Sequence, residues 1–116
     1  MAHAMLILFM LFGLLVMPSS PIEAQHRRAL LIGNAAYAHS PLRNPVNDAT
    51  DMATMLRRLG FEVTLIRDAD KPTMERAIGD FTRGVPQGSV GLFYFSGHGA
   101  QIEGLNYLLP VGAEFT

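Results

Sequence analysis

The chain has 116 residues, enough for one small domain; 49% of them are hydrophobic and 16% are charged. That balance is typical of a globular protein and excludes a disordered one. Nine basic residues against ten acidic ones, with no basic run, give no electrostatic support for nucleic-acid binding. The chain has no cysteine, which excludes disulfides, thiolate metal sites and a cysteine nucleophile within it. No cluster has metal-ligand spacing, so neither a metal nor another cofactor is predicted.

An unbroken apolar run, Ala4–Met17, comes first in the chain. It is shorter than the about 20 residues that span a bilayer, and it has the length of a signal-peptide core. Ala24 suits the last position before a cleavage site. We therefore expect residues 1–24 to be a signal peptide, the product to be periplasmic or extracellular, and residues 25–116 to form the folded domain. Because the first basic residue is Arg27, an uncleaved membrane anchor stays open as the alternative.

The next elements are a strand and a helix. The apolar run Arg28–Ile32 ends at Gly33-Asn34 and is typical of a strand that is buried on both faces. A helix is expected from Pro45, with Asn44 as its cap and Gly60 as its left-handed end. Its apolar face is formed by Val46, Ala49, Met52, Ala53, Leu56 and Leu59.

The remaining elements continue the alternation. Phe61–Arg67 alternates apolar and polar residues, which is typical of a strand near a sheet edge. A second helix is expected from about Pro72 to Thr82. The apolar strand Val90–Phe95 then runs into Ser96-Gly97-His98-Gly99, and a hairpin-like excursion follows with its turn at Glu103-Gly104.

This order of elements predicts an α/β fold with a mostly parallel, doubly wound sheet. Right-handed crossovers and the strand order second, first, third place the helices on opposite faces, as three α-β-α layers. Ligands of such sheets bind beyond the carboxyl ends of the first and third strands, which carry Asn34 and His98. The alternative for His98 is a histidine that hydrogen-bonds locally at a strand end.

A series of short motifs covers nearly everything from Arg28 onward. These motifs are Ala29-Leu30-Leu31-Ile32-Gly33-Asn34 with Tyr37, Leu42 through Asn44-Pro45, Asn47-Asp48-Ala49, Leu59-Gly60-Phe61, Phe93 through Gly99, and Gly104 with Asn106-Tyr107-Leu108-Leu109-Pro110. One of these motifs alone would be weak, but the set in this order is highly specific for a single family. The chain resembles the caspase and metacaspase clan of cysteine peptidases, especially bacterial caspase-like proteins.

The resemblance implies a cysteine endopeptidase that cleaves protein or peptide substrates through an acyl-enzyme. It makes His98 the catalytic histidine and the backbone N–H of Gly99 an oxyanion-hole donor. It places Asp48 and Ser96 in the primary specificity pocket, where an aspartate favours Arg or Lys before the cut bond. Arg43 in the first loop is a counter-signal, because caspases that prefer Asp use arginines there. Asp48 also suits a helix N-terminus for dipole reasons alone.

The nucleophile is where the chain departs from the family pattern. Caspase-type sequences place the cysteine about 50 residues after the histidine. The chain ends at Thr116 without one. The fold is therefore expected to be incomplete on its C-terminal side, with the third strand unpaired along one edge. Alone, the chain is predicted to be inactive, as part of a peptidase or, alternatively, as a non-catalytic binding or pseudo-enzyme module.

Overall fold

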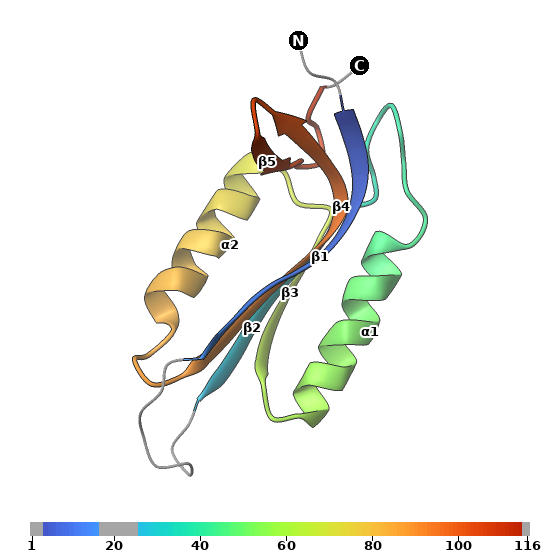
Figure 1. Ribbon diagram of the computed structural model, residues 1–116. Coiled ribbons are helices and arrows are strands. Elements are labelled where there is room, and N and C mark those ends of the chain that lie inside the picture. Colours follow the sequence, from blue (N-terminus) through green and yellow to red (C-terminus); the bar gives the residue numbers. More distant parts are fainter. Residues whose placement is uncertain (1–3, 17–25, 115–116) are drawn as a thin grey trace.

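The structure is a computed structural model that describes residues 4–16 and 26–114. Its elements are, in chain order, β1 (Ala4–Val16), β2 (Arg27–Gly33), α1 (Pro45–Arg58), β3 (Glu62–Arg67), α2 (Lys71–Gly84), β4 (Val90–Ile102) and β5 (Leu105–Leu108). The strands lie in the order β1-β4-β2-β3, and β5 pairs with β4. Figure 1 shows α1 and α2 on opposite sides of this sheet. The predicted layers and the predicted order of the parallel strands are confirmed.

β2 lies between β3 and β4 and pairs in parallel with both. Its side chains alternate between two hydrophobic cores. Ala29 and Leu31 belong to the core under α1, whereas Leu30 and Ile32 belong to the core that contains Met74 of α2. Burial of a large aliphatic side chain stabilises the fold by roughly 1.5–3 kcal/mol. The continuous apolar run in the sequence therefore reflects a strand covered on both faces.

α1 begins at Pro45 with Asn44 at the N-cap position, as expected, but the Asn44 side chain does not cap the helix. The backbone of Asn44 is already near-helical, with φ of −102° and ψ of −16°, and its side chain makes no capping hydrogen bond. A capping side chain normally reaches the first-turn N–H groups from an extended backbone. At the other end Gly60 has a φ of +86°, so the expected left-handed residue is confirmed. Leu59 is 53% exposed, so the buried face ends at Leu56.

α2 starts at Lys71, one residue earlier than expected. Asp70 caps it with an extended backbone, and its Oδ1 accepts a hydrogen bond of 3.0 Å from the backbone N–H of Thr73. The proline at position 72 falls in the first turn, where its missing N–H costs nothing. This cap fixes where the crossover from β3 enters the helix.

β4 is longer than the expected strand. Its parallel pairing with β2 ends at Ser96, opposite Gly33, and from Gly99 onward it pairs antiparallel with β5. The predicted turn is confirmed, since Glu103 and Gly104 have φ values of +51° and +81°. His98 therefore lies inside a long strand, just past the point where the parallel sheet ends.

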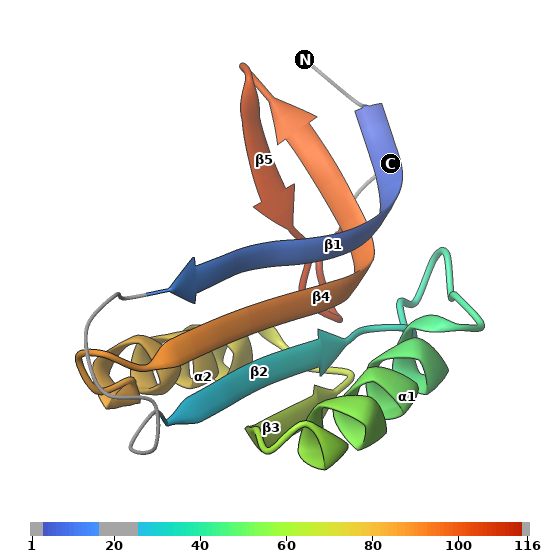
Figure 2. The same ribbon diagram turned by 60° about the horizontal axis from the view of Figure 1, so that its bottom comes forward.

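The expectation of an unpaired edge on β4 is wrong for this chain. β1 pairs antiparallel along that edge, on the side away from β2, with Ile7 in register with His98 (Figure 2). An open row of backbone N–H and C=O groups is a template for such pairing. The predicted cleavage point at Ala24 lies outside the described residues, and the signal peptide stays a prediction. Within residues 4–16 and 26–114, no helix has the length and apolarity to cross a bilayer.

Candidate active site

The candidate site lies where three segments meet past the carboxyl end of β2. These segments are the loop after β2, the middle of β4 and the stretch that follows β5. The backbone N–H of Asn34 donates to the carbonyl of Ser96 at 2.8 Å, which extends the parallel ladder by one bond. The backbone N–H of Leu109 donates to the carbonyl of His98 at 3.0 Å. The sheet itself therefore fixes the backbone around His98.

His98 is buried, with 6% of its surface exposed. Its Nε2 lies 2.7 Å from the carbonyl oxygen of Ser40, in the loop after β2. A carbonyl oxygen can only accept a hydrogen bond, so Nε2 carries the proton of this bond. In the neutral imidazole the lone pair is then on Nδ1. The loop thus selects the nitrogen that is able to act as a base.

Tyr37 lies against His98 from the same loop. Its hydroxyl donates to the carbonyl of Leu109 at 2.7 Å and accepts from the backbone N–H of His98 at 3.1 Å. The two rings have centroids 4.5 Å apart and planes tilted by 59°. Burial raises the pKa of Tyr37 to about 12, so the phenol is neutral at physiological pH.

Asn34, at the carboxyl end of β2, has a structural role at the switch point of the sheet. Its Oδ1 accepts from the backbone N–H of Ala69 at 2.8 Å, and its Nδ2 donates to the carbonyls of Ala69 and Leu109, both at 3.3 Å. Asp68 anchors the start of the loop, because its Oδ1 accepts from the N–H groups of Ala35 and Ala36. These bonds tie the ends of β2, β3 and β5 together.

The two glycines beside His98 have different surroundings. A Cβ on Gly97 would lie 2.7 Å from the Tyr37 hydroxyl and 2.8 Å from a ring carbon of Phe95, so no side chain fits there. Gly99 is buried within β4, in register with Leu6 of β1 on one side and Leu108 of β5 on the other. Its predicted role as an oxyanion-hole donor stays a prediction.

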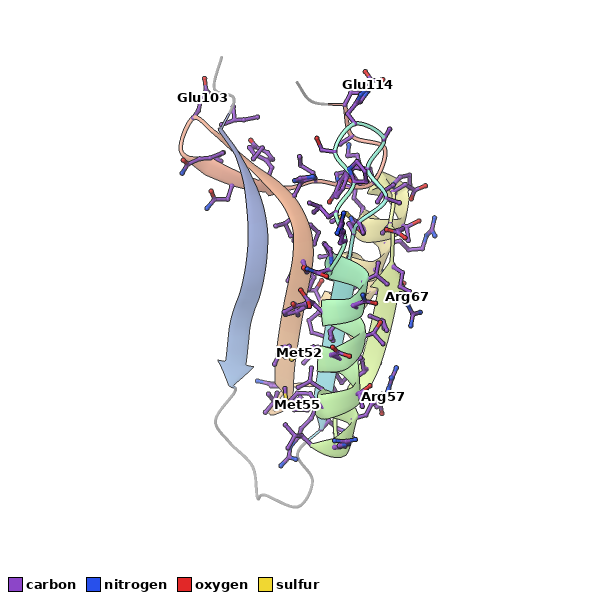
Figure 3. All side chains as sticks on the ribbon, turned by 90° about the vertical axis from the view of Figure 1, so that its right-hand side faces the viewer. Met52, Met55, Arg57, Arg67, Glu103 and Glu114 are labelled. Atoms are coloured by element: carbon purple, nitrogen blue, oxygen red, sulfur yellow. The ribbon has the colours of Figure 1, made fainter. Side chains whose placement is uncertain are left out.

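A shallow acidic hollow of about 330 Å³ lies between α1 and β4. Figure 3 shows Met52 and Met55 on the side of α1 that faces β4. The residues that line the hollow are Asp48, Asp51, Met52, Met55 and Tyr94. Its two carboxylates make it a surface suited to a cation.

Ser96 does not line this hollow but lies near Tyr94, which does. Two residues beyond Tyr94 on β4, it lies on the same face of the strand and is fully buried. Burial raises the pKa of Tyr94; the Ser96 hydroxyl opposes that rise and the Asp48 carboxylate adds to it. Ser96 Oγ has no hydrogen bond of standard geometry in the described structure, although the Tyr94 hydroxyl lies close enough to interact with it. Arg43 is exposed.

The sequence did not identify the carbonyl of Ser40 or the roles of Tyr37 and Tyr94. A backbone carbonyl leaves no signature in a sequence, because any residue type supplies it. Tyr37 did leave a signature in the sequence, since it is an aromatic residue between alanines in a loop of small residues. In the part of the chain that the structure describes, no three His, Asp or Glu side chains group as metal ligands.

Comparisons with known proteins identify the family of this chain. The model of the caspase domain, peptidase family C14, matches residues 26–116. Similar to this chain are the human mucosa-associated lymphoid tissue lymphoma translocation protein 1 and its mouse homolog, each 35% identical over 91 residues. That stretch is 78% of this chain and 11% of either relative. The chain therefore belongs to the caspase-domain family of peptidases.

Proposed function

We propose that this chain supplies the histidine-bearing part of a cysteine-type endopeptidase site, with His98 as its acid and base. The observation that carries the proposal is the 2.7 Å contact between Nε2 of His98 and the Ser40 carbonyl. It leaves Nδ1 as the basic nitrogen of a buried imidazole next to two glycines. That is the state which a general base for a thiol requires.

The chemistry follows from that tautomer. Nδ1 takes the proton of a cysteine thiol, and the thiolate attacks the carbonyl carbon of the substrate. The peptide C–N bond then breaks, the proton passes from Nδ1 to the leaving amine, and a thioester remains. Water hydrolyses the thioester with His98 again as base. The N–H of Gly99 is proposed to stabilise the oxyanion in both steps.

The thiol comes from outside these 116 residues, because they contain no cysteine. The chain alone is therefore expected to turn over no peptide. The edge of β4 that carries His98 is paired with β1 in the structure. We propose that the strand with the cysteine takes the place of β1 at this edge and brings the thiol to the imidazole.

We propose that the site prefers Arg or Lys before the cut bond. The support is the acidic hollow, where Asp48 and Asp51 lie beside Tyr94 and near the buried hydroxyl of Ser96. A cationic side chain there gains a charge-assisted hydrogen bond. The position of Asp48 in the first turn of α1 suits the helix dipole as well, and one carboxylate can serve both purposes.

The test is peptide turnover by a form that includes the thiol. The coding sequence downstream of Thr116 is read for a cysteine about 50 residues after the histidine, and the longer polypeptide is assayed on Arg-, Lys- and Asp-terminated reporters. We expect cleavage after Arg or Lys that His98→Ala abolishes. Asp48→Asn should lower kcat/KM for Arg about 10–100-fold, whereas Asp80→Asn, an exposed carboxylate on α2, should not.

The second candidate is a non-catalytic binding or pseudo-enzyme module, which a longer polypeptide without a cysteine would favour. A stop codon after Thr116, with no turnover from any cysteine-bearing partner, would support this module and contradict the peptidase proposal.

We also propose that residues 1–24 direct export. Fused to a reporter, they should move it out of the cytoplasm, and the mature chain should begin at Gln25. A reporter that stays inside the cell contradicts this.

A further inference from the structure

The hydroxyl of Tyr37 connects segments that are far apart in the sequence. It accepts from the backbone N–H of His98 and donates to the carbonyl of Leu109, with distances of 3.1 and 2.7 Å. Tyr37 is only 2% exposed; its bond with His98 is buried and its bond with Leu109 is partly buried. Bonds of this kind cost more to leave unmade than they gain when formed, which makes the arrangement specific.

The ring of Tyr37 restrains the imidazole itself. Its centroid lies 4.5 Å from that of His98, and the planes are tilted by 59°, within the range of favourable tilted aromatic pairs. At the far end of the imidazole, Nε2 is bonded to the carbonyl of Ser40. Tyr37 and Ser40 are three residues apart in one loop. This single loop therefore contacts the imidazole through the Tyr37 ring and bonds its Nε2 through the Ser40 carbonyl.

The hydroxyl of Tyr37 packs directly against β4 at Gly97, where a side chain would otherwise be. The closest heavy atom to a Cβ at position 97 would be the Tyr37 hydroxyl oxygen, at 2.7 Å. Real Cβ atoms essentially never approach another heavy atom that closely, so the strand has room for the phenol only because residue 97 is glycine. The residue before the histidine is therefore matched to the tyrosine.

We propose that Tyr37 is a positioning residue for His98, fixing both its backbone and its imidazole in the orientation that proton transfer requires. This inference rests on the proposed function for its catalytic consequence, not for its geometry. Tyr37 is not itself the base: its hydroxyl is engaged with Leu109, and burial keeps it protonated at neutral pH. Tyr37 acts on the tautomer of His98 only through Ser40: its two hydrogen bonds anchor the loop that places the Ser40 carbonyl against Nε2, which keeps the Nε2–H tautomer dominant.

Tyr37→Phe tests this, because it removes the hydroxyl and keeps a ring. In the full chain, NMR should show that the amide of His98 exchanges with solvent at least tenfold faster relative to the amide of Leu31. The nitrogen shifts of His98 should also show a mixture of tautomers. Tyr107→Phe, at an exposed position of β5, is the matched control and should change neither readout.

Equal acceleration of the His98 and Leu31 amides, with an unchanged tautomer, would show a merely structural role and overturn the proposal. Should Tyr37→Phe not fold, 3-fluorotyrosine at position 37 keeps the ring and makes the hydroxyl a weaker acceptor. The same amide must then exchange faster, and no change overturns the proposal. Neither readout needs peptidase activity, so failure of the longer, thiol-bearing form to cleave peptides would contradict the proposed function without affecting this result.

With the cysteine supplied, a kinetic readout is added. Tyr37→Phe should lower kcat at least tenfold and leave KM within twofold, since no substrate contact is removed. A rise in KM with kcat unchanged would mean that Tyr37 shapes substrate binding, and it would overturn the positioning role.

Discussion

The imidazole of His98 donates through Nε2 to the backbone carbonyl of Ser40, and this bond fixes the tautomer of the neutral ring. At mildly alkaline pH, where exposed imidazoles are neutral, Nδ1 of His98 should therefore give the nitrogen shift of an unprotonated ring nitrogen. Long-range nitrogen–proton correlation spectra measure this directly. His26 and His39, both exposed, are internal references and should show tautomer mixtures. A proton on Nδ1 of His98 would contradict the assignment.

The stability of the fold should fall at alkaline pH because of Tyr37. An unfolded tyrosine ionises near pH 10, whereas folded Tyr37 has a pKa of about 12. Between these values the unfolded state binds fewer protons, so the contribution is complete below about pH 10 and lost as pH rises to about 12. Denaturant melts across this range should show the decline, and Tyr37→Phe should flatten it. A smaller slope should remain until Tyr94, whose pKa is also raised, is replaced by Phe.

Gly97→Ala should destabilise the fold by about 1–3 kcal/mol, because the new methyl group meets the Tyr37 hydroxyl and the Phe95 ring. Gly91→Ala on the same strand is the control, since its Cβ would find only ordinary contacts of 3.5 Å or more. Combining Gly97→Ala with Tyr37→Phe removes one of the two clashes. The double variant should then be less destabilised than the sum of the singles, by about 1 kcal/mol. Strict additivity in urea melts would refute the steric link.

Asn34→Ala should cost roughly 1–3 kcal/mol in the free energy of unfolding. The buried N–H of Ala69 loses its hydrogen-bond partner, whereas the carbonyl of Leu109 keeps its bond from the Tyr37 hydroxyl. Asn47→Ala, at an exposed position of α1, should change stability by less than about 0.5 kcal/mol. Calorimetric unfolding distinguishes the two. An equal effect from both substitutions would mean that Asn34 does not hold the strand ends together.

Asp70 should make the stability of the fold fall at acidic pH. Hydrogen bonds from the side chain and the backbone N–H of Thr73 lower the pKa of its carboxyl. Its contribution is complete above the unfolded pKa of about 4 and is lost as pH falls through the lowered folded value. Asp70→Asn keeps a cap that does not titrate, so it should flatten the acid limb of a pH–stability curve. Asp70→Ala should lower stability at neutral pH too; if neither variant changes the curve, the cap is inactive.

Much of the fold could be predicted from local patterns. The apolar run at 28–32, the proline at the start of α1 and Gly60 at its end each reflect a constraint that acts within a few residues. The strand order then followed from the handedness of crossovers. The residue type of Asn44 wrongly suggested a side-chain cap. The near-helical backbone at this position, which prevents the cap, is set by the preceding loop and not by the residue type.

The site was predictable only in its position. The positions of His98 and Asp48 could be predicted from motif and topology. The contacts that orient the imidazole come from Ser40 and Tyr37, some 60 residues before His98 in the chain. Such contacts depend on how the loop after β2 folds back over β4. The pairing of β1 with β4 is likewise a tertiary outcome, since an apolar run has no fixed partner in the sequence.

Because β1 pairs with this edge of β4, a second strand cannot pair there at the same time. One edge of a strand offers its backbone donors and acceptors to a single neighbour, and residues 4–16 take them along the stretch that includes His98. Any polypeptide that adds a strand there competes with a segment tethered to the same molecule, and so at high effective concentration. Its apparent affinity is reduced in proportion to the fraction of chains whose edge is open. Cleavage before Gln25, as proposed for export, would sever this tether, and β1 would become a separate competitor that dilutes away.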